Sequence, residues 1–349
     1  MPSNQRRVEV TAYDPHWVAA FRQEAALLKS VFGDQALAVH HIGSTSVPGL
    51  PAKPVIDLLL EVRDIQAVDS YNEHMRGLGY EPHGEYGLPR RRYFPKSIAG
   101  KRFSHVHTWQ TLDPEIERHL SFRDYLIAHP QRSSAYGHLK EDLAARFAND
   151  MTRYIEGKHA YCQETERLAV TWTREIRAQI LQTKRLDLLP LNPAQLSHYL
   201  NRTTQLEAAL HLNLSRNILV EPVPRAIRAK IRNTTATSLP QLLWNTYWLV
   251  IIRDKSFGAG LIGFKGGPEP DGTVEIGYGI DTAVRRRGYT TEAVRALVGW
   301  ALAAAACQAV IARTKKDNLA SIRVLEKLDF SLAREEDEEL SWIAAETPG

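Results

Sequence analysis

Three arginines and a glycine, at residues 285–288, directly precede an alanine-rich amphipathic segment that starts at Thr290, and an extended segment at residues 274–280 leads into them. A strand that turns into a helix leaves backbone N–H groups at the helix start without partners, and the helix dipole adds positive charge there. The glycine lets the backbone approach a ligand, and the arginines can neutralise phosphate oxygens. The pattern predicts a pyrophosphate-binding turn; a solvated basic helix cap is the alternative.

A second motif follows this turn. It occupies residues 318–330, behind an apolar strand-like segment at residues 309–312. Together with residues 274–278, these segments resemble the GNAT family of acetyl-CoA-dependent N-acetyltransferases, nearest to the branch that includes the ribosomal-protein N-terminal acetyltransferases. The resemblance covers residues 184–345. It implies acetyl-CoA as the cofactor, held by its pantetheine arm along the strand near Ile280, and an amine substrate that is a small molecule or a protein N-terminus.

Acetyl transfer also needs a base for the amine and a proton for the departing thiolate. Glu275 is the candidate general base, because an amine with a pKa of about 10 must lose a proton before it attacks; a structural carboxylate is the alternative. For the thiolate, the resemblance places Ser321 where many family members have a tyrosine. Tyr278 is expected in the core, on the strand face opposite Glu275. The expected cofactor-binding residues are Ile280, Arg285, Arg286, Arg287, Gly288, Tyr289, Thr290, Thr291 and Asn318.

Other interpretations stay open at this site. Asn318 and Ser321 stand at a helix start, where either can instead cap free N–H groups. Two residues depart from the family's pattern. Thr290 replaces a glycine or alanine, and Asp329 replaces a glycine where left-handed backbone is expected, at a cost of about 1 kcal/mol. The acidic residues 335–339 form either a solvated turn or a surface that attracts a cationic amine.

The first half of the chain carries a different pattern. An apolar strand-like segment, residues 36–42, leads into a small-residue turn, and a second buried strand, residues 53–62, carries Asp57. This half resembles the nucleotidyltransferase superfamily and, in more detail, the GrpB family, over residues 7–168. The likeness rests on His-x-Gly-Ser-Thr at residues 41–45, Lys-Pro-x-x-Asp at 53–57 and His-Val-His at 105–107, and it continues through residues 91–94, 119–126 and 154–158.

Whether the first half reacts depends on its metal ligands. A nucleotidyltransferase holds two metal ions with clustered carboxylates. The superfamily's pair sits at positions i and i+2, but Leu59 occupies the second position here, and Glu61 lies about 13 Å from Asp57 at about 3.3 Å per residue. His105 and His107 face one side of a strand and, with Asp57, could bind one divalent metal or a nucleotide phosphate; ordinary hydrogen bonds are the alternative. The candidate residues are Gly43, Ser44, Thr45, Lys53, Asp57, His105 and His107, with Arg91 and Arg92 as further phosphate contacts or a solvated basic face.

The length of 349 residues suffices for two domains. We expect an α/β (α+β) protein with a nucleotidyltransferase-like mixed sheet followed by a GNAT mixed sheet, each with helices. The expected domains are a GrpB-like domain at residues 1–168, a helical linker at 169–183 and a GNAT domain at 184–349. Within them, a helical region is expected to break at Gly157, and residues 244–253 are expected to form a strand.

Composition narrows the class of protein. The formal net charge is +4, with acids and bases intermingled, so nucleic acid is not an expected partner. No apolar stretch approaches the roughly 20 residues of a membrane span, and the first residues lack a signal-peptide pattern, so we expect a cytoplasmic protein without a membrane partner. The two cysteines, Cys162 and Cys307, are too few for a disulfide framework or a zinc site.

The sequence therefore predicts an acetyl-CoA-dependent N-acetyltransferase fused to a GrpB-like domain. Two roles stay open for that domain: a nucleotide-binding role, as a nucleotide-handling enzyme, or a binding and stabilising module for the acetyltransferase. Two alternatives are a non-catalytic protein that binds a nucleotide or coenzyme A, and a nucleotidyltransferase that acts through the first domain.

Overall fold

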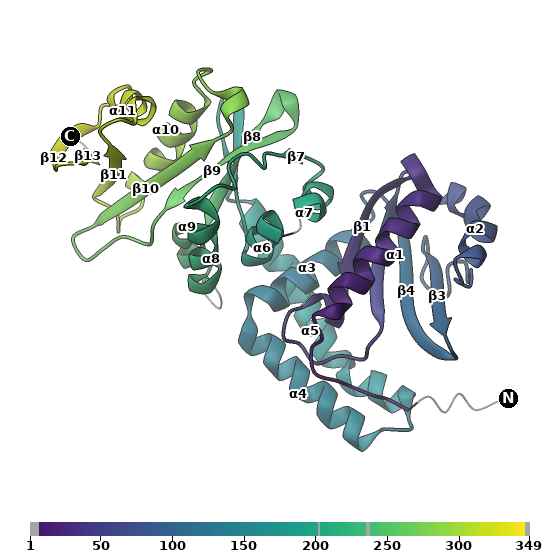
Figure 1. Cartoon of the computed structure of the whole chain (residues 1–349). Helices are drawn as coiled ribbons and strands as arrows, with labels where there is room; N and C mark the ends of the chain where they lie inside the picture. Colours follow the sequence, from purple (N-terminus) through teal and green to yellow (C-terminus); the bar gives the residue numbers. More distant parts are fainter. Residues whose placement is uncertain (1–6, 202, 235–237, 346–349) are drawn as a thin grey trace. The chain divides into compact units, whose positions relative to one another are not determined.

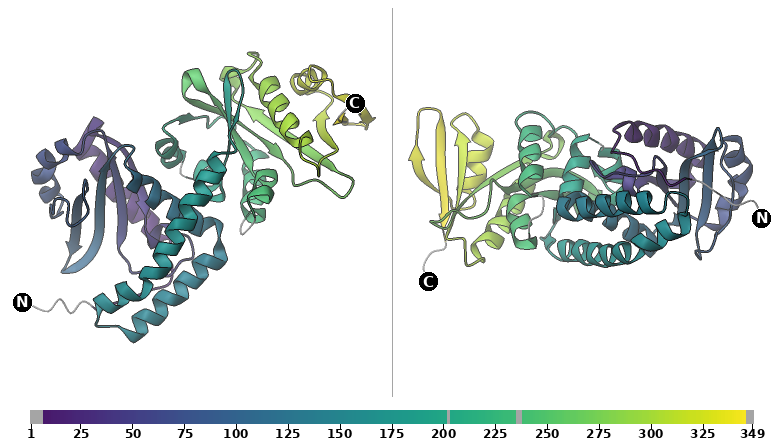
Figure 2. Two further views of the ribbon diagram at one scale, coloured as in Figure 1. Left: turned by 180° about the vertical axis from the view of Figure 1, so that it is seen from behind. Right: turned by 90° about the horizontal axis from the view of Figure 1, so that it is seen from below.

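Two sheets, each with its own helices, organise the chain (Figures 1 and 2). The computed structural model describes residues 7–201, 203–234 and 238–345, so the outermost residues of both expected domains lie outside the described part. The chain divides into two compact units, Met1–Arg174 and Glu175–Gly349. The expected fold class, a mixed sheet with helices in each of two domains, is confirmed.

The first unit is built on a four-stranded sheet, within the described residues, in the order β1-β2-β4-β3. The central pair, β2 (Ile56–Val62) and β4 (Lys101–Gln110), is parallel. The outer strands, β1 (Ala36–Ile42) and β3 (Arg92–Ile98), run antiparallel to their neighbours. The parallel register places Asp57 directly opposite His105.

Helices cover both faces of this sheet. On one face, Leu58 and Leu60 of β2 belong to the core cluster that includes the buried side of α1 (His16–Phe32). On the other face, Leu59 clusters with residues of α3 (Pro114–Ala128). Figure 1 shows α1 lying along β1, and α2 (Asn72–Gly77) lies beside the same core. Because side chains alternate along a strand, Asp57 shares the α3 face with Leu59.

Two long helices complete the first unit, α4 (Pro130–Arg146) and α5 (Met151–Arg177). The helical region was expected to break at Gly157, and this prediction is wrong, because the break falls at residues 147–150 and Gly157 lies inside α5. A Cβ atom at Gly157 would lie 2.5 Å from a methyl carbon of Leu143 in α4. The glycine therefore permits close helix packing rather than ending the helix.

The second unit holds a nine-stranded mixed sheet, within the described residues, in the order β12-β13-β11-β10-β9-β8-β6-β5, with β7 paired to β9. Its strands are β5 (Leu181–Gln182), β6 (Leu186–Pro190), β7 (Asn213–Leu214), β8 (Tyr247–Ile252), β9 (Phe257–Phe264), β10 (Thr273–Ile280), β11 (Ala309–Lys315), β12 (Ser331–Glu335) and β13 (Glu339–Ala345).

Helices pack against this second sheet as well. Leu196, Leu206 and Ile227, from three different helices, join one core cluster with strand residues of β8 and β9. Elsewhere on the sheet, Trp300 of α10 lies 5.4 Å from Trp248 of β8, between ring centroids. The helices are α6 (Pro193–Asn201), α7 (Thr203–Leu210), α8 (Val223–Asn233), α9 (Leu239–Asn245), α10 (Tyr289–Leu302) and α11 (Leu319–Glu326).

The expected strand at residues 244–253 starts too early. Residues up to Asn245 belong to α9, and β8 begins at Tyr247. The backbone N–H of Ser238 donates to the side chain of Gln241 at 3.2 Å, and Pro240 follows Ser238 in the first turn. Ser followed three residues later by Gln is a helix-start signal, and it outweighs the apolar pattern here.

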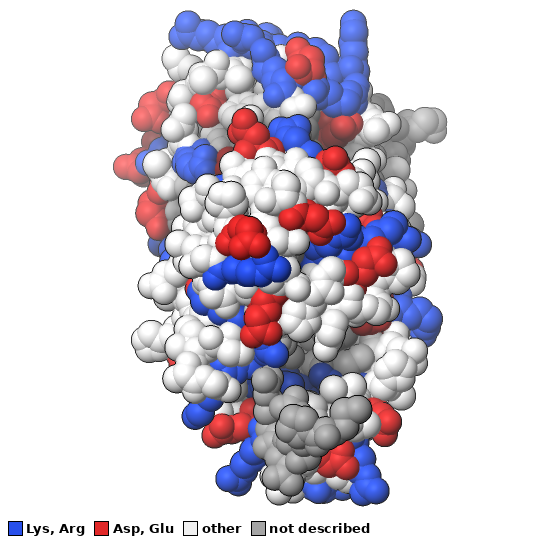
Figure 3. Space-filling model, turned by 90° about the vertical axis from the view of Figure 1, so that its right-hand side faces the viewer, with Lys and Arg blue, Asp and Glu red and all other residues white. Residues whose placement is uncertain are grey.

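Two further observations concern the surface. No helix in the described part of the chain combines the length and the apolar character that crossing a membrane requires. Acidic and basic side chains are interspersed over most of the face shown in Figure 3.

Candidate functional site

The turn before α10 is shaped by its backbone. Gly288 precedes the first helical residue with a left-handed φ of 80°, and Arg286 has a φ of 60°. A left-handed backbone conformation costs glycine little and costs arginine more, so the backbone at Arg286 is strained. The first N–H groups of α10 have no partner within the helix. The turn thus presents backbone donors and the positive end of a helix dipole at one place.

Two residues far away in sequence hold this turn. The Arg185 guanidinium donates to the carbonyl oxygen of Arg287 at 2.9 Å and to Glu292 at 2.7 Å. The Thr183 hydroxyl donates to Glu292 at 2.6 Å. Burial alone would raise the pKa of Glu292, but the hydrogen bonds from Thr183 and Arg185 outweigh it and lower the pKa. The first-turn carboxylate is therefore already paired, which leaves the helix start available to another anion.

The side chains of the turn divide into two groups. Arg285, Arg286 and Arg287 are exposed, and no carboxylate in the described part of the chain forms an ion pair with them. Tyr289 is only 7% exposed and lies under Arg185, whose guanidinium carbon is 4.6 Å from the ring centroid. The Tyr289 side chain thus packs against Arg185 and stabilises the turn. Thr290 and Thr291 follow in the first helical turn, both half-buried.

The strand that leads into the turn has an unpaired edge. β10 pairs with β11 only over its first three residues, and from Ile276 to Ile280 it pairs only with β9. Backbone groups on the β11 side of that stretch are therefore free to pair with an extended ligand. At Gly277 and Gly279, an added Cβ atom would find no heavy atom within 4 Å. The edge near the expected residue Ile280 is open.

Glu275 lies where β10 and β11 separate, since it is the last β10 residue paired with β11. Its carboxylate forms an ion pair with Lys265, and Arg313 Nε lies 3.9 Å from its other oxygen. Lys265 directly follows β9 and Arg313 lies in β11, so these contacts tie Glu275 to residues on both sides of β10. The position still suits the expected general base, because Glu275 stands beside the open edge.

The expected thiolate-side residues lie at the start of α11. Asn318 is the N-cap, and its side-chain oxygen accepts from the Ser321 N–H at 3.3 Å. The capping interpretation of Asn318 is therefore confirmed. Asp329, just after this helix, has the expected left-handed φ, at 58°.

Tyr278 differs from its expected place in the core. It is half-buried, and its hydroxyl has no hydrogen-bond partner among the described residues. Burial raises the pKa of Tyr278, and the nearby Ser321 hydroxyl partly offsets the rise. The sequence analysis assigned Tyr278 no role at the site, although its hydroxyl lies near that of Ser321.

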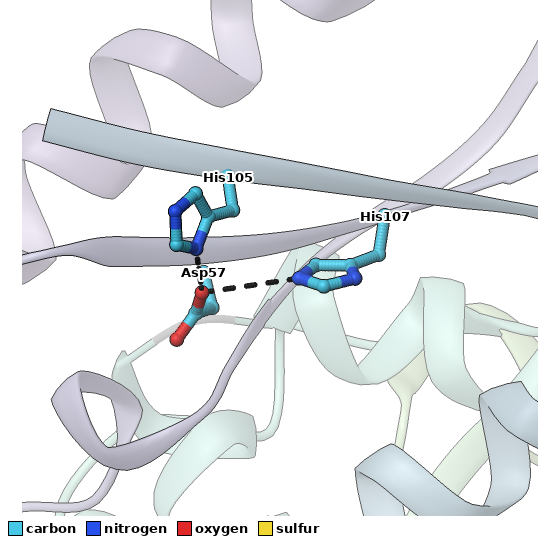
Figure 4. Close-up of side chains that lie close together, drawn as sticks. All are labelled: Asp57, His105 and His107. Atoms are coloured by element: carbon cyan, nitrogen blue, oxygen red, sulfur yellow. Dashed lines mark hydrogen bonds and ion pairs between the residues drawn. The ribbon is translucent and has the colours of Figure 1, made fainter. Parts of the chain in front are cut away.

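The first unit brings together three of its candidate residues, Asp57, His105 and His107 (Figure 4). One oxygen of Asp57 lies 3.0 Å from Nδ1 of His105 and 3.9 Å from Nε2 of His107. Burial would raise the pKa of Asp57, but the hydrogen bonds from the two histidines outweigh it and hold the pKa well below its usual value. The group is thus an ionised carboxylate between two imidazoles.

The same three side chains offer metal ligands. Their ligand atoms all lie within 4.8 Å of one another, whereas two ligands about 2.1 Å from one metal lie about 3.0–3.4 Å apart. However, an Arg91 nitrogen lies 3.5 Å from Nδ1 of His107. Because arginine only donates, this contact leaves the proton on Nε2, which then donates toward Asp57. The contacts favour the hydrogen-bonded alternative.

The remaining candidates of the first unit have mixed roles. Gly43 has a φ of 69°, and an added Cβ atom would collide with the Asp57 carboxylate. Thr45 is 1% exposed and its hydroxyl lies 3.1 Å from His41, so it stabilises the turn. The Nζ atom of Lys53 lies 3.7 Å from the sulfur of Met151.

The neighbouring charged residues are engaged elsewhere. Arg92 donates to Asp69, at 2.7 Å, and Arg91 is buried, donating to the carbonyl oxygen of Tyr86. Neither forms the solvated basic face considered above. The carboxylate of Glu61 lies 3.3 Å from the His40 ring and does not join the Asp57 group, as its spacing along the strand predicted.

Comparison with protein families matches each unit to a different one. A family model described as GrpB protein matches residues 7–167, and one described as Acetyltransferase (GNAT) domain matches residues 185–331. UPF0157 protein YqkA of Bacillus subtilis is 46% identical over 170 residues, which cover 49% of this chain and 49% of YqkA. The match therefore spans about half the length of that relative.

Two further relatives match shorter parts of the chain. A UPF0157 protein of Halalkalibacterium halodurans is 33% identical over 159 residues, covering 45% of this chain and 80% of that protein. The uncharacterized N-acetyltransferase YjdG of Bacillus subtilis is 38% identical over 96 residues, covering 28% of this chain and 57% of YjdG. The chain belongs to the GrpB family through its first unit, and its second unit is a GNAT acetyltransferase domain.

Proposed function

We propose that this chain, a GrpB-family domain followed by a GNAT domain, is an acetyl-CoA-dependent N-acetyltransferase that acts on a primary amine in the cytoplasm. One observation carries the proposal: the open edge of β10 leads directly to the turn at residues 285–288, with its exposed arginines and helix start. A ligand with amides along its length and a pyrophosphate at one end fits both features.

Binding follows from these two features. The N–H groups at the start of α10 and the exposed arginines hold the pyrophosphate. The free backbone groups of residues 276–280 pair with the amides of the pantetheine arm, as a neighbouring strand would. The paired Glu292 keeps a competing carboxylate away from the phosphates.

The chemistry needs two proton movements. The amine nitrogen attacks the thioester carbonyl carbon of acetyl-CoA, the carbon–sulfur bond breaks, and coenzyme A leaves as a thiol. Glu275 accepts the proton of the attacking amine, directly or through a water. Tyr278, with Ser321 beside it, is protonated at neutral pH and donates its proton to the departing sulfur. Ser321, which the family resemblance places at the departing sulfur, lies beside this hydroxyl.

Release of free thiol from acetyl-CoA tests the proposal. The full chain is assayed with small amines and with peptides that carry a free N-terminus. We expect turnover with at least one class, and a loss of roughly 100-fold in kcat for Tyr278→Phe, with acetyl-CoA affinity retained. Tyr13→Phe, in the first unit, is the matched control. A Tyr278→Phe variant with full kcat would remove that residue from the mechanism.

Two other outcomes correspond to the alternative functions. Tight acetyl-CoA binding with no thiol release for any amine would make the second unit a coenzyme A binding module. Magnesium-dependent consumption of a nucleotide, without thiol release, would place the activity in the first unit instead.

A further inference from the structure

Three lysines of the first unit gather around two buried tyrosines. Lys53 precedes β2, Lys140 lies on α4 and Lys158 on α5. The Nζ atoms of Lys53 and Lys158 lie 5.5 Å and 5.3 Å from the ring centroid of Tyr154. Nζ of Lys140 lies 4.5 Å from the centroid of Tyr136. We call these three residues the lysine cluster.

Lys140 is the unusual member, because it is only 2% exposed. Its ammonium group donates to the carbonyl oxygen of Pro51. No carboxylate in the described part of the chain forms an ion pair with any of the three lysines. A buried ammonium group without an opposite charge is costly, and two further cations nearby add to the cost. Such an arrangement is stable when an anion binds among the charges.

Two glycines bring the lysines together. Gly157 lets α5 approach Leu143 of α4, so that Lys158, the next residue, comes close to the helix that carries Lys140. Gly137 of α4 lies against Pro51, with a would-be Cβ contact of 3.0 Å, in the segment that leads to Lys53. The close packing of three segments is therefore what assembles the cluster. Neither glycine has a role in the acetyltransferase unit.

The cluster adjoins the candidate residues of β2 and β4. An added Cβ atom at Gly43 would meet the Asp57 carboxylate, and the side chain of the next residue, Ser44, lies near the Tyr136 hydroxyl. Lys53 is close enough to Asp57 for the carboxylate to oppose the lowering of its pKa that burial and Lys158 cause. A ligand with its anionic group at the lysines would have the Asp57 group and its histidines next to it.

We propose that Lys53, Lys140 and Lys158 bind a phosphate group of a small phosphate-bearing ligand at the Gly43–Ser44 turn. Phosphate fits because it offers several acceptor oxygens and at least one full negative charge, and lysine binds it as a point charge from several directions. The site lies within the first unit and does not depend on the proposed acetyl transfer.

Calorimetry on the full chain tests the site. The probes are inorganic phosphate, pyrophosphate and ATP, each measured with magnesium and with a chelator, which separates a metal-assisted mode from direct binding. We expect Lys158→Met and Lys140→Met to weaken binding of the preferred probe by roughly tenfold or more. Lys101→Met changes an exposed lysine at the start of β4; it is the matched control and should bind like the wild type.

The comparison among probes identifies the source of the phosphate. Preference for ATP over pyrophosphate points to a nucleotide, and equal binding points to the phosphate groups alone. Because ATP could also occupy the coenzyme A turn, only the part of its binding that the lysine variants remove counts for this site. No binding of any probe, or binding that is unchanged in both lysine variants, would overturn the proposal.

Stability gives a second measurement that does not require a tight ligand. Without added anions, Lys140→Met should raise the melting temperature of the first unit by roughly 2–4 °C, because it removes a buried unpaired charge. Pyrophosphate should stabilise the wild type and not the variant. A Lys140→Met variant that is destabilised, and still stabilised by pyrophosphate like the wild type, would show a purely structural lysine.

Discussion

The two candidate sites differ in the groups that would contact a ligand, which are backbone groups in the second unit and side chains in the first. At the start of α10, the backbone presents the binding groups, and the nearest side chains either point to solvent or hold the turn from behind. In the first unit, side chains present the groups, and Asp57 and His105 already bond to each other. A backbone site should tolerate many side-chain changes but no added Cβ at its turn. A side-chain site should show the reverse.

The sharpest test of this difference is Gly288→Asp. The φ of 80° disfavours any side chain, and a new Cβ atom would lie 3.3 Å from Arg185. The added carboxylate would also sit where the phosphates bind, at the helix start. We expect acetyl-CoA affinity, measured by calorimetry, to fall by roughly 100-fold or more.

The matched control for that change is Gly299→Ala, which lies in the last turn of the same helix, where an added Cβ atom meets nothing within 4 Å. It should leave acetyl-CoA affinity unchanged. Arg285→Ala should cost less than Gly288→Asp, because two arginines remain. If the arginine change alone abolished binding, the site would be a side-chain site and the contrast between the units would fail.

Asp57→Asn probes the side-chain site. The asparagine keeps the shape but loses the charge that both histidines face. We expect a loss of about 1–2 kcal/mol in the free energy of opening β2 and β4, measured by amide hydrogen exchange of those strands. The comparison variant is Asp69→Asn. Asp69 forms a more exposed ion pair with Arg92, so we expect its loss of opening free energy to be less than about 0.5 kcal/mol. Equal effects would argue that Asp57 is an ordinary surface carboxylate.

The lysine cluster adds a pH dependence that the turn of the second unit lacks. Burial, and after it the charge of Lys158, lower the pKa of Lys140 from 10.5 to about 7. Cys162 and Glu141 partly oppose this shift, and Lys53 adds a smaller lowering effect. Between about pH 7 and 10 the unfolded chain therefore binds more protons at this lysine than the folded chain. Stability relative to Lys140→Met should rise as the pH rises through that window.

Urea unfolding of the wild type and Lys140→Met at pH 7 and pH 9 measures this difference. Phosphate should act in the opposite direction, stabilising the wild type more at pH 7 than at pH 9, because it needs the charged ammonium group. A difference between the two proteins that does not change with pH would mean that Lys140 stays charged throughout.

The contrast between the units also shows what the sequence could predict. The strand at residues 36–42 matches β1, because a continuous apolar run between turn signals determines it locally. The turn at residues 285–288 was predictable for the same reason, since a strand, a glycine and a helix start are all local signals. Residues that act across the fold were not predictable. Arg185 and Lys140 reach their places only through packing of distant segments.

The register between β2 and β4 explains why the site of the first unit could be predicted only in part. The alternation of His105 and His107 was readable from the strand, but their meeting with Asp57 requires β2 and β4 to be adjacent and parallel with one particular register. Nothing local in the sequence specifies that register. The Arg91 contact that favours one His107 tautomer is likewise a product of the folded loop.

The smallest expected effect concerns the acidic turn between β12 and β13. The two interpretations of residues 335–339, a solvated turn and a surface that attracts a cationic amine, predict different results. Glu335 pairs with Lys316 and Glu336 with Arg334, so part of the negative charge is already balanced. Changing Asp337→Asn together with Glu338→Gln removes two exposed charges without touching those pairs.

If the turn attracts a cationic amine, KM for the amine should rise in this double variant by roughly two- to threefold at low salt and not at high salt, with kcat unchanged. Glu269→Gln, an exposed acid after β9, controls for general charge, and an unchanged KM in the double variant would leave the turn as a solvated hairpin.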